Sequence, residues 1–146
     1  MTGQAFYVAS SFRNKEAVHY VADQLKRLGL HQTYDWTIHA DSRGTLSVEE
    51  LKQIGEQEMQ AVGEADFIVA LLPGGKGTHV EIGMALALRK PLFLYSLDDA
   101  IDHVEATATF YHLSGVTKCF GSLEELVETI IGQHSRKTLC KEGDGV

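Results

Sequence analysis

The chain has 146 residues, of which 44% are apolar and 23% charged, a composition typical of one globular domain and not of a disordered chain. The formal net charge of −7 excludes a protein that coats DNA or RNA, because such a protein needs a basic surface. We find neither a membrane-length apolar run nor a signal-like segment, so we expect no membrane partner. Two cysteines, Cys119 and Cys140, are too few for a disulfide framework, and we expect a cytoplasmic location.

The first half of the chain predicts two strands, each followed by a helix. Aromatic and β-branched residues at Gln4–Ala9 predict the first strand. Asn14 is placed to cap a helix that ends at Gly29. A second strand is expected over Thr33–Ile38, and the capping-box pattern beginning at Ser47 predicts a second helix that runs to about residue 64.

The second half continues the alternation. The apolar run Phe67–Leu72 is typical of a strand covered on both faces, and we expect Thr78 to cap a third helix that is apolar nearly all round and therefore buried. Strands at Pro91–Tyr95 and Thr117–Phe120 follow, and a last helix begins at Ser122. The alternation predicts an α/β fold, a doubly wound parallel five-stranded sheet with helices on both faces. We expect this domain to span residues 1–132, with a flexible polar tail over residues 133–146.

In such a sheet a ligand binds beyond the carboxyl ends of the strands. We expect three segments to meet there: Ser10–Asn14, Pro73–Glu81 and the long loop Ser96–Val116. Glycines let a ligand approach the backbone, and the start of a helix favours negative charge. The candidate substrate-binding residues are Ser10, Ser11, Arg13, Gly74, Gly75, Gly77 and Thr78. The turn is neither a Walker A loop, which needs Ser or Thr directly after Gly-Lys, nor a dinucleotide fingerprint, which needs glycine where Val80 stands.

Glu81 is the first candidate catalytic residue, and two interpretations of it stay open. Thr78-x-x-Glu81 has the pattern of a capping box, which would explain the carboxylate structurally. A carboxylate close to a helix N-terminus also stays ionised, as a nucleophile or a stabiliser of a cation requires.

Three other residues and the histidines bear on the chemistry. Glu58 lies on the apolar stripe of the second helix, so it is paired, is hydrogen-bonded, faces a cleft or bends out to solvent. Trp36 either stacks on a base or fills a gap, and Tyr7 alone is more typical of a core. The seven histidines have no metal-ligand spacing, so we expect neither a metal nor a cofactor.

Several stretches together carry a family resemblance: Phe6–Phe12, Ala65–Leu72, Gly77-Thr78-His79-Val80-Glu81-Ile82-Gly83 and Lys90-Pro91. Over most of residues 5–96 the chain resembles the nucleoside 2-deoxyribosyltransferase family, including the related deoxynucleoside 5′-monophosphate N-hydrolases. The resemblance implies a flavodoxin-like fold, Glu81 as the nucleophile on the anomeric carbon, and Tyr7 as the hydroxyl that orients it. Glu58 stands where the family has an aspartate that contacts the base or assists its protonation.

The resemblance also implies a homodimer or higher homo-oligomer, in which a neighbouring subunit completes each active site. The aromatic, weakly charged segment Thr107–His112 is then either an interface or a lid, or it folds back onto its own core.

Two features of the turns bear on the substrate. The transferases carry an aspartate at the position of Gly75, whereas Ser11-Phe12-Arg13 is similar to the phosphate-binding Ser-Ile-Arg of the N-hydrolases. Pro73–Glu81 also matches the PGGxGTxxE motif of the cytokinin-activating phosphoribohydrolases. We therefore expect an enzyme that cleaves the N-glycosidic bond of a small nucleoside or nucleotide, not of a nucleic-acid polymer, and passes the sugar to water or to another base. The alternatives are a TIR-like NAD hydrolase and a non-catalytic nucleotide-binding or signalling module.

Overall fold

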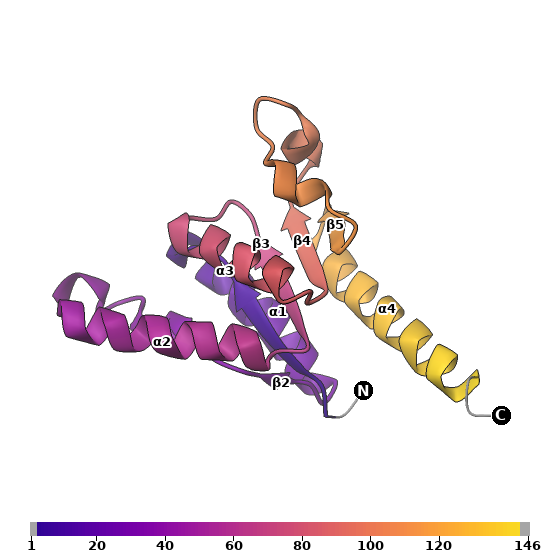
Figure 1. Cartoon of the computed structure of the whole chain (residues 1–146), viewed down its shortest axis with the longest axis horizontal. Helices are drawn as coiled ribbons and strands as arrows, with labels where there is room; N and C mark the ends of the chain where they lie inside the picture. The colour runs from indigo at the N-terminus through magenta and orange to yellow at the C-terminus, as the bar shows by residue number, and fades with distance from the viewer. Residues whose placement is uncertain (1–2, 144–146) are drawn as a thin grey trace.

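The computed structural model describes residues 3–143, without the side chains of residue 43 and of residues 135–143, and places one five-stranded sheet between two layers of helices (Figure 1). The strands are β1 (Ala5–Ala9), β2 (His31–Gln32), β3 (Phe67–Leu71), β4 (Leu92–Ser96) and β5 (Val116–Phe120). They are all parallel, in the order β2-β1-β3-β4-β5. This is the flavodoxin-like order, so the predicted fold class is confirmed.

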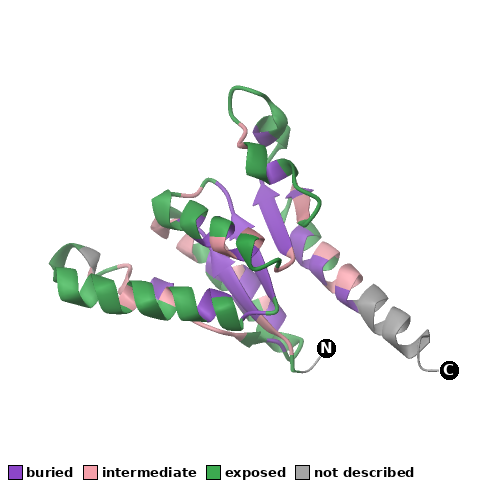
Figure 2. Ribbon diagram, in the orientation of Figure 1, coloured by how far each residue is buried: buried purple, intermediate pink, exposed green. Residues whose placement is uncertain are grey.

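Each face of the sheet is covered by a pair of helices. Helices α1 (Lys15–Arg27) and α4 (Leu123–Gly143) pack together, and α2 (Val48–Glu64) packs on α3 (Lys76–Ala87). Every residue of β3 and β4 is buried, whereas the outer side of α2 is exposed (Figure 2). Within residues 3–143, no helix is both long and apolar enough to cross a membrane.

Several predicted helix ends are confirmed by their hydrogen bonds. The Ser47 hydroxyl accepts from the Glu50 N–H at 3.1 Å, and the Ser122 hydroxyl accepts from the Glu125 N–H at the same distance. Gly29, with φ of 89°, follows α1 in the left-handed conformation that favours glycine. Helix α4 continues through residues 133–143, so the domain boundary at residue 132 and the flexibility of the tail stay predictions.

The predicted second strand over Thr33–Ile38 is wrong. Only His31–Gln32 pairs with β1, and a 3₁₀ turn, Trp36–His39, follows. The Asp35 carboxylate accepts from the Thr37 N–H at 3.0 Å, which caps this turn. A local bond from side chain to backbone therefore overrides the β-propensity of the segment.

The start of the third helix also differs from the prediction. Helix α3 begins at Lys76, and Thr78, two residues later, accepts from the Gly75 N–H through its hydroxyl at 3.1 Å. Glu81 therefore lies in the second turn, and the capping-box interpretation of Thr78-x-x-Glu81 is wrong. The expected burial nearly all round is wrong too, since Val80 is 59% exposed.

Candidate active site

A cavity of about 390 Å³ opens at the carboxyl ends of β1 and β3, where the order of the sheet reverses. Its volume lies in the range of about 300–1,000 Å³ that is usual for small-molecule sites. Seven of the ten predicted site residues line it: Ser10, Ser11, Glu58, Gly75, Gly77, Thr78 and Glu81. The structure thus brings together the turn after β1, the turn after β3, and helix α2.

Glu81 is a buried carboxyl group in the wall of this cavity. The residue is 6% exposed, and its Oε2 atom accepts no hydrogen bond from the described residues. Burial raises the pKa of Glu81 to about 8; the charge of Glu58 also raises it, and the Tyr7 hydroxyl opposes the rise. The prediction that the helix N-terminus keeps Glu81 ionised is therefore wrong at neutral pH. The helix dipole acts within the first turn, and Glu81 lies beyond it.

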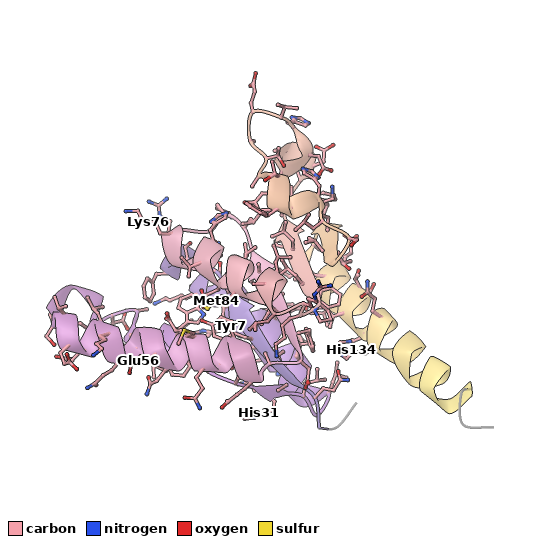
Figure 3. The ribbon with its side chains drawn as sticks, in the orientation of Figure 1. Tyr7, His31, Glu56, Lys76, Met84 and His134 are labelled. Carbon is pink, nitrogen blue, oxygen red and sulfur yellow. The ribbon has the colours of Figure 1, made fainter. Side chains whose placement is uncertain are left out.

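Tyr7 lies on β1 between α2 and α3 and outside the cavity lining (Figure 3). The residue is fully buried, and its hydroxyl has no hydrogen bond of ordinary geometry among the described residues. Burial, followed by the charge of Glu81, raises the pKa of Tyr7. The two side chains are thus close enough for each to shift the pKa of the other. Two buried polar atoms without partners, side by side under a cavity, mark a functional site better than a structural one.

Glu58 is half-buried on α2 and lines the cavity, so the interpretation that it faces a cleft is confirmed. Its charge raises the pKa of Glu81, of Tyr7 and of Tyr34. Two carboxyl groups therefore influence each other across one site, an arrangement that lets one stay protonated while the other ionises.

The turns at the cavity are held by internal hydrogen bonds. The Ser10 hydroxyl donates to the Leu71 carbonyl at 2.8 Å and accepts from the Asn14 amide at 3.1 Å. Gly74 does not line the cavity, and a Cβ atom there would lie 2.5 Å from Thr78 Cγ2. Ser10, Thr78 and Gly74 therefore shape the turns, and their expected contact with substrate stays a prediction.

Two cations lie near these turns. Arg13 is exposed on the 3₁₀ turn Phe12–Asn14 and does not line the cavity. Lys76, the first residue of α3, does line it, and Figure 3 shows this side chain at the start of the helix. Sequence reasoning missed Lys76, although its place inside the glycine turn was a usable signal.

An aromatic wall closes one side of the cavity. Phe12 and Trp36 meet edge to face with ring centroids 5.3 Å apart, and both line the cavity. The indole N–H of Trp36 donates to the Val8 carbonyl at 2.7 Å, which fixes the ring. The Trp36 ring is therefore anchored in the core, as the gap-filling alternative expects, and it also borders the cavity, as stacking on a base would require.

The expected third segment is absent from the lining. No residue of the loop Ser96–Val116 borders the cavity, although the loop contacts the segment Pro73–Glu81. The Tyr111 hydroxyl lies 2.7 Å from His79 Nε2, which holds the loop against the exposed side of α3. Within Thr107–His112, Tyr111 folds onto the core, whereas Phe110 is 61% exposed. Among the described residues, no group of His, Cys, Asp and Glu is arranged to hold a metal ion.

Solved structures similar to this one include two enzymes whose names state their activity. The CMP N-glycosidase BcmB of Clostridium botulinum has 17% sequence identity and a TM-score of 0.59, over 87% of this chain and 98% of that chain. The 2-deoxyribosyltransferase of Bacillus psychrosaccharolyticus has 22% identity and a TM-score of 0.54, over 70% of this chain and 79% of that chain. A third structure, BlsM, has 20% identity and a TM-score of 0.63, over 85% and 87%. At these identities the likeness shows a shared fold.

Sequence comparison with curated proteins finds no match. The family model for nucleoside 2-deoxyribosyltransferase, in contrast, matches residues 6–116. That span holds all but the first residue of β1, the whole of β3 and β4, the aromatic wall, and both carboxyl groups of the cavity. The chain therefore belongs to the nucleoside 2-deoxyribosyltransferase family.

Proposed function

We propose that this protein cleaves the N-glycosidic bond of a nucleoside or nucleotide, with Glu81 as the nucleophile. One observation carries the proposal: the buried Glu81 carboxyl group borders a ligand-sized cavity and has one oxygen without a partner among the described residues. A carboxylate placed in this way is suited to the anomeric carbon of a sugar, where positive charge develops as the base departs.

The reaction runs in two steps. A Glu81 carboxylate oxygen bonds to the anomeric carbon while the carbon–nitrogen bond breaks, and the electron pair of that bond leaves with the base. Glu58 is the proton donor to the departing base, because it is the other carboxyl group in the cavity wall. A water molecule or a second base then attacks the same carbon and frees Glu81. Tyr7 is a positioning residue, because it touches Glu81 and lies outside the cavity lining.

The sugar 5′ end of the substrate lies at the turns that precede α1 and α3. The first-turn N–H groups of α3 and the Lys76 ammonium offer a place for a 5′-phosphate, with Arg13 beside it. This arrangement favours a nucleotide over a nucleoside.

The test is a panel of nucleosides, deoxynucleotides and NAD, incubated with and without an acceptor base and analysed for released base and new nucleoside. Wild type should release free base, and Glu81→Gln should lose on the order of 10³-fold in rate. Glu56→Gln is the matched control, because Glu56 is exposed on α2 and outside the cavity lining. Cleavage of NAD alone would identify an NAD hydrolase, and undiminished turnover by Glu81→Gln would contradict the role of Glu81.

We also infer that copies of this chain associate. Three large apolar side chains are exposed on α3, at its C-terminal cap and on the loop that contacts it: Val80 at 59%, Leu88 at 55% and Phe110 at 61%. Exposed apolar groups on an otherwise packed layer support an interface between subunits.

A further inference from the structure

We propose that Gly55 sets the size of the base that this site accepts, and that the space it leaves is filled by a bicyclic purine. The inference rests on the proposed function, because it assigns the part of the cavity in which the departing base lies.

Gly55 lies on the α2 wall of the cavity. Leu51, Ile54, Gly55 and Glu58 all border the cavity, and their spacing of three, four and seven residues places them on one side of the helix. The aromatic wall of Phe12 and Trp36 borders the same cavity from other elements. Gly55 therefore stands in the middle of the helical wall, one turn before the proposed proton donor.

Neither backbone conformation nor packing explains a glycine at this position. Gly55 is inside the 17-residue helix α2, where glycine is less favourable than alanine, and it is not among the residues with a positive φ. A Cβ atom built on it meets no heavy atom within 4 Å. Since Gly55 borders the cavity, a side chain at position 55 would extend into the cavity and not into protein.

The remaining contacts place the base in this part of the cavity. Glu81 holds the anomeric carbon and the turn before α3 holds the phosphate, which leaves the space between α2 and the aromatic wall for the base. A flat base gains stacking contacts on the face of one ring of the aromatic wall and dispersion contacts with the edge of the other, because the two rings are nearly perpendicular. Its edge then faces Glu58 and the gap at Gly55. A bicyclic base fills that gap, whereas a monocyclic base leaves part of it without contacts.

The experiment compares Gly55→Leu with Gly63→Leu, using deoxyadenosine and deoxycytidine and their 5′-monophosphates. Gly63 is the matched control, because it lies in the same helix, is exposed, has no atom within 4 Å of a built Cβ, and is outside the cavity lining. Circular dichroism of each variant reports whether α2 is intact. Wild type should have the higher kcat/KM for the purine substrates. Gly55→Leu should lower the purine-to-pyrimidine ratio of kcat/KM by about 10- to 100-fold, and Gly63→Leu should leave it unchanged.

A binding measurement separates this inference from the proposed reaction. Trp36 is the only tryptophan in the sequence and borders the cavity, so its fluorescence reports occupancy without any turnover. In the Glu81→Gln background, deoxyadenosine 5′-monophosphate should quench Trp36, and adding Gly55→Leu should weaken that binding by a similar factor. If wild type cleaves no substrate, but Glu81→Gln shows the quenching and the added Gly55→Leu weakens it, the proposed reaction fails and the role of Gly55 stands. A pyrimidine preference in wild type, or a ratio that Gly55→Leu leaves unchanged, overturns the role of Gly55.

Discussion

Replacing Glu81 with glutamine should make the fold more stable at neutral and alkaline pH, and the size of this effect follows from the pKa of Glu81. The carboxyl group has an ordinary pKa of 4.5 in an unfolded chain and a pKa of about 8 in the folded protein. The folded state therefore holds this proton more tightly than the unfolded state. Between these two values, wild-type stability falls as pH rises, because ionising Glu81 in its buried site opposes folding.

Each unit of pKa difference corresponds to about 1.4 kcal/mol. From pH 5 to pH 8 the wild type should lose roughly 3 to 4 kcal/mol of unfolding free energy through Glu81 alone. The side-chain amide of the Glu81→Gln variant does not titrate, so the stability of this variant relative to wild type should grow by that amount over the same interval. Whole domains are stable by only about 5–15 kcal/mol, so the change is large enough to measure.

Urea unfolding at pH 5, 6, 7 and 8 gives this difference directly, because all groups common to both proteins cancel. Glu56→Gln is the control and should show no trend with pH. Glu58→Gln should reduce the wild-type slope, since the charge of Glu58 helps to raise the pKa of Glu81. A difference between Glu81→Gln and wild type that stays constant across pH would refute the reasoning, because Glu81 would then ionise as an ordinary exposed carboxyl group.

Three further predictions concern activity and assembly. With Glu81 ionised and Glu58 protonated in the reactive form, kcat/KM should stay level up to about pH 8, where the two carboxyl groups still share one proton, and fall about tenfold per pH unit above it. Initial rates from pH 5.5 to 9 check this, and a rate that keeps rising through pH 8 contradicts it. Arg13→Ala and Lys76→Ala should each raise KM for 5′-nucleotides several-fold and spare nucleosides, whereas equal effects on both substrates would argue against a phosphate site. Sedimentation at micromolar concentration should show a species larger than the 16.1 kDa chain, and Val80→Asp should shift it to monomer; a fully active wild-type monomer would disprove a shared site.

The parts of the fold that the sequence predicted are those decided by local pattern. The apolar runs that became β3 and β4 are buried on both faces, the capping box at Ser122 forms in full, and the Ser47 hydroxyl caps α2. The prediction of the second strand failed because the Thr37 N–H donates to the Asp35 carboxylate and not to a neighbouring strand. The periodicity of the sequence does not reveal which of these two bonds forms. The start of α3 failed for a similar reason, since the Thr78 hydroxyl binds backward to the Gly75 N–H.

The candidate site divides in the same way. Glu58 and Glu81 could be found from the sequence because an acidic residue stands out on an apolar stripe or beside a glycine turn. Phe12, Leu51 and Ile54 were missed because apolar residues at these positions are equally typical of a core. They line a cavity only because α2 packs over the point where the strand order reverses. The ionisation of Glu81 was mistaken for a related reason: proximity to a helix N-terminus is visible in the sequence, whereas burial is a property of the whole fold.

The same burial connects the stability and the proposed chemistry of Glu81. Removing a carboxylate from water makes its ionised form less stable, which weakens the fold as pH rises. It also leaves the ionised group with few hydrogen bonds that would lower its reactivity, since the Tyr7 hydroxyl lies beside Glu81 but Oε2 has no partner of ordinary geometry among the described residues. Positive charge on the sugar of a bound substrate offsets the lost hydration, so the site favours ionised Glu81 most strongly when the anomeric carbon is in place and the base is departing. A site selected for stability alone would give Glu81 a partner. The cavity beside it instead leaves that place to the substrate.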